Sequence, residues 1–388
     1  MAATSSIKTR LFSLLLALYL ISSTPKPIRA EDAITYKYED YQEDNDRIRV
    51  QAHYVKVDKD LGINTTLSVI GLVDTITGST PTGAPIQDDD PNQVPLGNLV
   101  DKRESIVVDL DHKKGDHTFI FELSHSDESD YLSQGGAFTY KRGLNKNNTT
   151  LQFGYSLLDD ELTAVTLRDP ETKTSHDFFA GFTQVMDPAT VITTNLGYGK
   201  ETGYLADPYK SVQKSVEILP DFFLPILFRE NRPRAREKWI LQTEVLHDIQ
   251  NLNASVQASY RYFSDDAGID SHTWSIEWYQ KLSEKLILRP VFRYYRQSAA
   301  NFYHYDLDQT NIIPDRDTIG TAPYYSSDHR LSKLETVTYG AKLVWFITDE
   351  WELNLKFNRY EMSGRDGITH PSAYSDADVL TVGGRWWF

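Results

Sequence analysis

The stretch Trp351-Glu352-Leu353-Asn354-Leu355-Lys356-Phe357-Asn358 alternates apolar and polar side chains at every position. Successive side chains of a β-strand point to opposite faces, so this segment has one apolar and one polar face. The same alternation recurs at 149–155, 252–262 and 273–278. Such a pattern predicts either a half-buried antiparallel sheet or a membrane-spanning barrel.

Counting the strands and their connections separates these two possibilities. The predicted strands cover 33–41, 47–57, 63–75, 102–112, 116–126, 134–142, 147–158, 176–186, 189–200, 237–248, 252–263, 271–282, 286–297, 333–346, 351–361 and 376–388. Short turns such as 143–146 and 347–350 alternate with mostly longer connections such as 76–101, 201–236 and 298–332. An even strand number with short turns at one rim and long loops at the other is typical of outer-membrane barrels.

We therefore predict an all-β fold, a transmembrane up-and-down antiparallel β-barrel of about 16 strands with long extracellular loops and short periplasmic turns. Barrels of about 14 or 18 strands are the alternatives if a segment is miscounted. No apolar run long enough for a transmembrane helix occurs beyond residue 30. The polar average composition follows if half of each strand faces a lumen.

Charge and cysteine content exclude further classes. The 388-residue chain carries a net charge of -15 and has no cysteine. It therefore lacks disulfides, thiolate metal sites and thiol nucleophiles, and its acidity argues against nucleic acid as a partner.

The N-terminus predicts export. Lys8 and Arg10 precede the apolar run 11–21, and small residues lead to Ala30. This is the pattern of a signal peptide over 1–30, cleaved to leave 31–388 as a single barrel domain, with a membrane anchor as the alternative. Cleavage would change the net charge from -15 to -19 because four basic residues are lost.

The C-terminus and the tryptophans agree with the barrel. Gly384, Trp386 and Phe388 end the last strand in alternation, which resembles the C-terminal insertion signal of outer-membrane barrels. The seven tryptophans all fall near strand ends, as two interfacial belts would require. We expect Trp278, Trp345, Trp351, Trp386 and Trp387 at the periplasmic rim and Trp239 and Trp274 at the outer rim.

The alternation also predicts which charged residues face the lumen. These are Lys37, Glu39, Arg49, Asp109, Asp111, Glu122, Glu244, Arg261, Glu277, Lys281, Arg289, Arg293, Glu352, Lys356 and Arg385. Mixed signs favour salt bridges that fill and stabilise the interior, whereas rings of one sign would favour ion selectivity. The functional alternative is a solute pathway with Arg261, Arg289, Arg293, Glu277 and Lys281 as candidates, where an arginine surplus would suit a small anionic solute.

The outer loops are acidic and contain histidines, which suggests either a solvated surface or divalent cations. Oxygen and imidazole ligands suit such ions, and the acidic loops could also be bridged by them to lipopolysaccharide. The candidate ligands are Asp265, Asp266, His272, His304, Asp328 and His329. No other cofactor is expected.

Enzyme activity is the less favoured class. Ser124-His125 and Ser271-His272 are neighbours in the chain, so their side chains would point to opposite faces of a strand. The motifs of serine hydrolases, phosphate loops and zinc proteases do not occur.

Several segments resemble an uncharacterised family of Gram-negative outer-membrane barrel proteins, a domain of unknown function. The matching residues are 34–38, 41–43, 79–85, 92–96, 203–205, 208–210, 232–234, 260–262, 271–273, 289–290, 293–295, 297–303 and 327–332. The resemblance implies an outer-membrane location and loops that fold back on the barrel mouth, but no substrate or catalytic residue. Two positions depart from the family pattern: Ala267, where tryptophan is common, and His329, where tyrosine is common. The second departure weakens the metal hypothesis.

The function predicted from these observations is a porin-like channel for small solutes, partly closed by the loops 201–236 and 298–332. The alternative is a non-conducting scaffold or receptor that docks a periplasmic or surface partner. Membrane lipid, lipopolysaccharide and the barrel assembly machinery are the expected partners in either case, and the sequence leaves the oligomeric state open.

Overall fold

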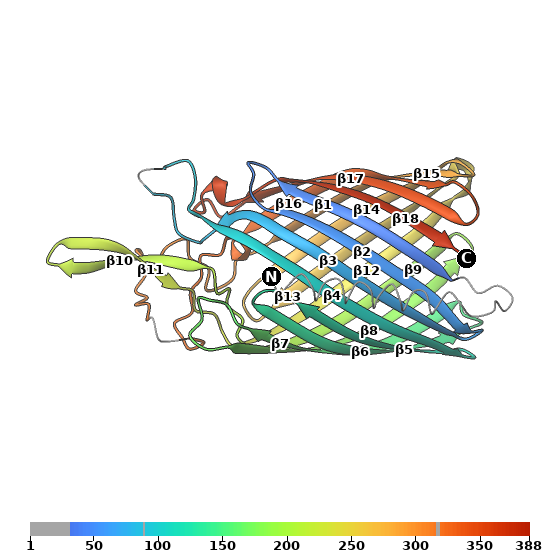
Figure 1. Cartoon of the computed structure of the whole chain (residues 1–388), viewed down its shortest axis with the longest axis horizontal. Coiled ribbons are helices and arrows are strands. Elements are labelled where there is room, and N and C mark those ends of the chain that lie inside the picture. The colour runs from blue at the N-terminus through green and yellow to red at the C-terminus, as the bar shows by residue number, and fades with distance from the viewer. Residues whose placement is uncertain (1–31, 88–89, 316–318) are drawn as a thin grey trace, which may run out of the picture.

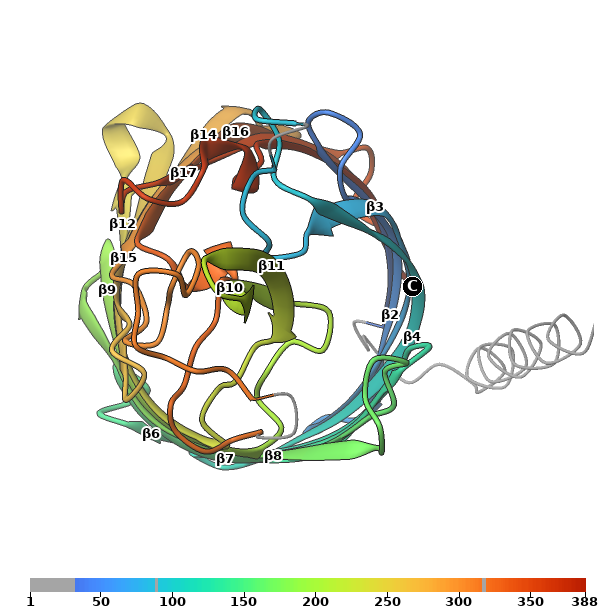
Figure 2. The same cartoon turned by 90° about the vertical axis from the view of Figure 1, so that its left-hand side faces the viewer.

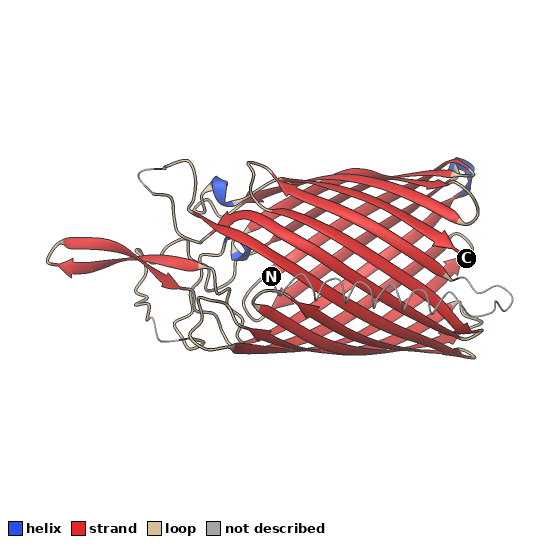
Figure 3. Cartoon of the chain, in the orientation of Figure 1, coloured by secondary structure: helices blue, strands red, loops and turns tan. Residues whose placement is uncertain are grey.

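The computed structural model describes residues 32–87, 90–315 and 319–388, which form a closed barrel with a two-stranded hairpin projecting beyond its mouth (Figure 1). The predicted signal peptide, residues 1–30, lies outside the described residues. Strands make up nearly all of the regular structure, and the helices are single 3-10 turns (Figure 3). None of the helices within the described ranges is long and apolar enough to cross a membrane.

Sixteen strands form the wall, as the sequence predicts. They are β1 (Ala33–Glu43), β2 (Arg49–Gly62), β3 (Thr65–Pro81), β4 (Leu96–Lys114), β5 (His117–Asp127), β6 (Tyr131–Leu144), β7 (Thr149–Leu162), β8 (Glu171–Asp187), β9 (Thr190–Gly203), β12 (Ala235–Ile249), β13 (Ala254–Asp265), β14 (Asp270–Ser283), β15 (Leu286–Gln297), β16 (Leu334–Phe346), β17 (Trp351–Gly364) and β18 (Ala377–Trp387). Each wall strand pairs antiparallel with its neighbours, and β1 pairs with β18 from Ala33↔Trp387 to Glu43↔Ala377, which closes the ring.

The hairpin of β10 (Ser211–Leu219) and β11 (Phe222–Arg229) lies within a stretch that the sequence predicts as a loop. Its apolar run with Pro225 lacks the two-residue period of the wall, and proline argues against a strand inside a sheet. Pro225 is tolerated because β11 has only one neighbour, so one edge needs no hydrogen-bond donor.

The alternation of the sequence corresponds to the two faces of the wall. On β17, Leu353, Leu355 and Phe357 are 40–50% exposed on the outside, whereas Lys356 between them lines a cavity in the lumen. With lipid as the solvent outside, apolar residues there need no protein core. Polar residues face the water-filled interior.

Two orientations differ from the prediction. Arg49 forms an ion pair with Asp40 at 2.6 Å on the outer face, so it does not face the lumen. Trp387 lies on the same face as Arg385, whose guanidinium sits 4.9 Å from its ring and which faces Asp58 in the lumen. Trp387 therefore turns inward and does not join the belt, because it immediately follows the outward Trp386.

Pro290 lies within β15, where a central proline is unusual. The ladder between β14 and β15 has no residue pair between Glu277↔Val291 and Gln280↔Leu288. Pro290 falls in this interruption, so its missing N–H costs no ladder hydrogen bond to β14.

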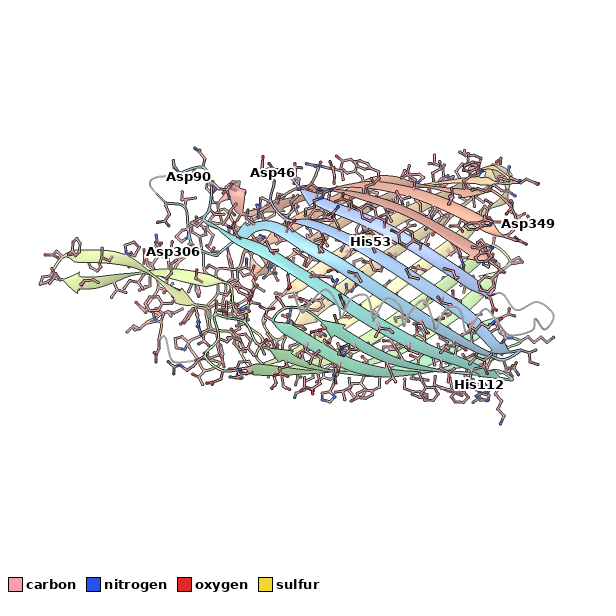
Figure 4. The ribbon with its side chains drawn as sticks, in the orientation of Figure 1. Asp46, His53, Asp90, His112, Asp306 and Asp349 are labelled. Atoms are coloured by element: carbon pink, nitrogen blue, oxygen red, sulfur yellow. The ribbon has the colours of Figure 1, made fainter. Side chains whose placement is uncertain are left out.

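The two rims differ as the connection lengths predict. Asp349 and His112 lie near the short-turn rim, and Asp90 and Asp306 lie among the long loops at the opposite end (Figure 4). Viewed from that end, loops and the hairpin cross the mouth of the barrel (Figure 2). The loops thus fold over the opening, as the family resemblance implies.

Candidate functional site on the lumen wall

Three cations stand side by side on the lumen face of adjacent strands. Arg289 of β15 is in register with Lys342 of β16, and Lys342 is in register with Lys356 of β17. Like charges at directly opposite positions destabilise a sheet. We call these three residues the basic row.

A cavity of about 290 Å³ lies over the basic row. Its lining residues are Lys37, Glu39, Glu277, Arg289, Val291, Lys342, Asn354, Lys356 and Thr381. They come from β1 and β14–β18, so the cavity spans the seam where the first and last strands pair. Asn354 and Thr381 add an amide and a hydroxyl beside the charges.

The cations of this cavity outnumber its carboxylates. Arg289 donates to Glu277 at 2.6 Å, and Lys37 lies 2.9 Å from Glu39. Within the described residues, neither Lys342 nor Lys356 has a carboxylate at ion-pair distance. With four cations and two carboxylates in its lining, the cavity is electropositive.

Carboxylates gather on another part of the wall. Asp58, Ser68, Asp109 and Glu122 occupy one row across β2 to β5, since each is in register with the next. Asp58 accepts from Ser68 at 2.6 Å and is paired with Lys56 at 2.8 Å. The acidic row, on β2 to β5, and the basic row, on β15 to β17, occupy different parts of the wall, and their nearest members, Asp58 and Lys356, are three strands apart around the ring.

The five lumen candidates are brought together only in part. Arg289 and Glu277 line the cavity over the basic row. The side chains of Arg261, Arg293 and Lys281 lie on the same lumen face but do not line this cavity. Arg293 instead lies 5.7 Å from the ring of Tyr295. The prediction did not single out Lys342 or Lys356 for the pathway. Their signal was the register between β15, β16 and β17, which sequence periodicity does not give.

A partly buried network of charges joins the loops at the mouth. Arg232 lies 2.8 Å from Glu230 and 2.9 Å from Asp328, and Arg330 joins Asp328 and Asp207, each at 2.6 Å. These five residues, here called the plug network, come from the segments 204–234 and 298–332. Because the carboxylates of Glu230 and Asp328 are buried, each depends on its guanidinium partners.

The pKa values of the two buried carboxyl groups in the plug network shift in opposite directions. Burial raises the pKa of Glu230. By contrast, Arg330 and Arg232 overcome the burial of Asp328 and hold the pKa of its carboxyl well below the usual range. Burial lowers the pKa of the adjacent His329 to about 4, because a charged imidazole would lack solvation there.

Hydrogen bonds and packing between uncharged groups join further loops to the segments that carry the plug network, here called the plug. The Ser327 hydroxyl lies 2.6 Å from the Gly83 carbonyl oxygen and 2.7 Å from that of Ser211, and it can donate its one proton to either. Gly83 has a φ of +91°, and a Cβ there would meet the Ser211 carbonyl at 2.3 Å, so only glycine permits this approach. Val212, Leu307 and Tyr325 pack together beneath the hairpin.

The predicted metal ligands do not converge. His272 is bonded to the Tyr260 hydroxyl at 2.7 Å and stacks on Trp274 on the outer face, Asp265 is held by Arg236 at 2.5 Å, and Asp328 belongs to the plug network. His329 is buried against Tyr374, His304 lies beside Asp306, and Asp266 is exposed. Across the described ranges, no three histidine or acidic side chains are placed to hold a metal ion. Arginines pair with Asp265 and Asp328, and the six candidate side chains do not form one cluster, so metal binding at the outer loops stays a prediction.

Comparison with known proteins agrees with this architecture. A family model described as "Protein of unknown function (DUF3570)" matches residues 16–172 and 164–380. The chain belongs to the DUF3570 family. No curated protein matches the chain.

Among solved structures, CdiB from Acinetobacter baumannii is similar with a TM-score of 0.51 and 8% identity, over 92% of this chain and 60% of CdiB. OmpT, an outer membrane protein of Vibrio cholerae, is similar with a TM-score of 0.46 and 8% identity, over 94% of this chain and 100% of OmpT. The siderophore receptor PirA from Pseudomonas aeruginosa gives 0.45 and 12%, over 93% of this chain and 62% of PirA. The chain thus spans about three fifths of the receptor's length.

These similarities concern the fold alone. The DUF3570 chain has the closed antiparallel β-barrel fold of outer-membrane proteins. Its setting is therefore membrane lipid, and barrels of this class are inserted by the barrel assembly machinery.

Proposed function

We propose that this DUF3570 protein is a porin-like conduit for small anionic solutes, with the basic row as the selective part of its pathway. The observation that carries the proposal is the row itself: Arg289, Lys342 and Lys356 are adjacent on the lumen face, and only Arg289 has a carboxylate partner in the described structure. Lysine and arginine lining a pore favour anions.

The energetics of the row support this interpretation. Three adjacent cations repel one another, and the low-dielectric wall behind them screens this repulsion less than bulk water would. An anion in the cavity would relieve the repulsion, and the amide of Asn354 and the hydroxyl of Thr381 could bind its remaining oxygens. A bound solute can still leave, because lysine ammonium groups are flexible and strongly hydrated.

The acidic row gives a second reason to expect selectivity. A solute that passes between Lys342 on one part of the wall and Asp109 on another experiences a transverse field. Such a field would orient polar solutes and would restrict anions to the basic side. The lumen candidates Arg261, Arg293 and Lys281 extend the basic side and remain proposed parts of the pathway.

The plug would limit entry from outside. The segments 204–234 and 298–332 cross the mouth (Figure 2) and are joined by the plug network. We propose that passage occurs around or through this plug and that conductance per channel is small.

Recording from single channels in planar bilayers tests the proposal. We expect discrete small conductance steps and, in a KCl gradient, a reversal potential of the sign given by chloride preference. Absence of steps from both the wild type and a variant with a loosened plug would reject the conduit.

One feature favours a second candidate, a surface receptor or scaffold. The hairpin β10–β11 projects from the mouth (Figure 1) and leaves Leu219, Phe222 and Phe223 more than half exposed. Exposed apolar surface marks interaction sites more often than chance. If no conductance is found, this hairpin is the place to look for a partner. Cation bridges from the acidic loops to lipopolysaccharide stay a prediction.

A further inference from the structure

A second cavity, of about 540 Å³, lies at the barrel mouth between the wall and the plug. Its lining includes the aromatic residues Tyr131, Tyr204, Phe302 and Tyr324 and the alanines Ala206 and Ala267. No residue lines both this cavity and the cavity over the basic row, so the two cavities are separate. The size falls within the range of small-molecule sites, about 300–1,000 Å³.

Four of the five charged side chains that line this mouth cavity have ion-pair partners. Lys173 is paired with Asp160 at 3.0 Å, and Arg236 with Asp265 at 2.5 Å. Glu201 is paired with Lys238 at 2.7 Å.

The fourth charged lining residue, Arg232, belongs to the plug network, where Glu230 and Asp328 neutralise it. Asp266 is the exception among the lining acids, and its side chain is exposed to water at the rim. A charged ligand would therefore lose hydration on entry without gaining an unpaired counter-charge inside.

Apolar and aromatic groups dominate the remaining lining. Tyr204 and Phe302 are at most 9% exposed and present ring surface, and Tyr131 and Tyr324 add two further rings. No described residue forms a hydrogen bond with the hydroxyl of Tyr204 or Tyr324. Both residues line the cavity, and a tyrosine hydroxyl can donate and accept a hydrogen bond.

We propose that the mouth cavity binds an uncharged ring compound, aromatic or cyclic, that carries one or two hydroxyl or amide groups. Its ring would pack between the aromatic side chains, and its polar groups would bond the free tyrosine hydroxyls. The proposal does not depend on whether the barrel conducts, because it concerns other residues and an uncharged ligand.

Single cysteines can test this site because the chain contains none. Ala206→Cys and Ala267→Cys place a thiol in the cavity wall, and Val165→Cys places one on a loop where the side chain is 89% exposed. The full chain in lipid nanodiscs is labelled with N-phenylmaleimide, which is uncharged, or with a sulfonated maleimide. Heat-modifiable electrophoretic mobility confirms that each variant is folded.

We expect the rate ratio of uncharged to sulfonated reagent to be about tenfold higher at the cavity positions than at position 165, because entry strips water from the sulfonate. Benzyl alcohol should slow cavity labelling saturably, whereas benzoate, its charged counterpart, should not. Neither compound should protect position 165.

Three results would overturn the proposal. One is an equal reagent ratio at all three positions, and another is failure of benzyl alcohol to protect either cavity position. The third is a lack of reaction at both cavity positions, since the cavity would then be closed to ligands. A conductance result on the basic row changes none of these outcomes.

Discussion

Arg289 donates a 2.6 Å hydrogen bond to Glu277, and its guanidinium lies 4.1 Å from the ring centroid of Tyr279 on the same strand as that carboxylate. The arginine is thereby held by two contacts, whereas the neighbouring Lys342 and Lys356 have no carboxylate partner among the described residues. With one cation paired to a carboxylate and two that have no such partner in the described structure, the basic row should be sensitive to single charge changes, which leads to the first two predictions.

Neutralising the two lysines should weaken anion preference. In the double variant Lys342→Gln and Lys356→Gln, we expect the anion-to-cation permeability ratio to fall about fivefold or more, since a unit charge at about 4 Å is worth ~1 kcal/mol even in water. The reversal potential in a salt gradient measures this permeability ratio. Lys102→Gln is the matched control, because Lys102 pairs with Glu104 on the outer face. An unchanged reversal potential in the double variant would remove the row from the pathway.

Removing the carboxylate should have the opposite effect. In Glu277→Gln, Arg289 is no longer neutralised, so we expect a higher permeability ratio for anions and tighter block by a slowly permeating anion. The Tyr279 contact remains to hold the guanidinium. The same bilayer recording measures this ratio, and a shift of the permeability ratio toward cations would contradict the proposed anion pathway.

Breaking the plug network should release the mouth. Asp328→Asn leaves Arg232 and Arg330 without their shared carboxylate. Loss of one partner of a buried ion pair costs about 3–5 kcal/mol. We expect faster hydrogen exchange in 204–234 and 298–332 with the wall strands unchanged, and larger conductance if the barrel conducts. In the control Glu104→Gln, an exposed pair is lost, for which ~0–1 kcal/mol is expected.

Acid should loosen the same region through His329. Burial lowers its pKa from 6.5 to about 4, so the folded plug disfavours the protonated form. The stabilisation from neutral His329 is complete above about pH 6.5 and is lost as pH falls toward about 4, by about 3 kcal/mol at most.

Loop hydrogen exchange between pH 7 and pH 4 measures this effect. We expect His329→Gln to lack the acid step that the wild type shows. Glu230 acts in the opposite direction, because its raised pKa favours its protonated form as pH falls. The difference between wild type and variant therefore isolates the histidine. Equal pH profiles for the two proteins would refute the assignment.

The proposed insertion signal is open to a direct test. Trp386 stacks with Trp351 at 5.7 Å and lies 4.7 Å from Phe388, so the three rings form an outer cluster at the closing seam. Trp386→Ala should lower the folded fraction recovered with purified assembly machinery, and removal of Phe388 should slow insertion. Trp387→Ala is the matched control, because that ring faces the lumen. Heat-modifiable mobility reports the folded fraction.

Much of the wall could be predicted because one physical rule governs it. Lipid outside and water inside force a two-residue period on every strand, and Trp351–Asn358 displays it without a fault. Arg49 deviates because it lies at the outer end of β2, where an ion pair with Asp40 replaces contact with lipid. Near the rims, water reaches both faces and the period loses its meaning.

The candidate site was harder to predict because it depends on register. Periodicity shows that Arg289 and Lys356 face inward but not that Lys342 lies between them. The contacts of the plug were still harder to predict from the sequence, since they join residues far apart in the chain, such as Ser327 and Gly83. Asp265 and Asp328, two of the candidate metal ligands, have arginine partners that no spacing rule identifies.

The pairing of β1 with β18 also determines how the chain can fold. Residues at opposite ends of the described chain are hydrogen-bond partners, as in Ala33↔Trp387, so the most non-local contacts complete the wall. Such contacts repay the entropy of loop closure only late in folding, which makes folding slow. Until that last pairing forms, β1 and β18 each present an unpaired edge that could join another chain. A barrel that has not yet closed is therefore prone to aggregate. Protection of β1 and β18 until they pair must come from factors other than the chain itself.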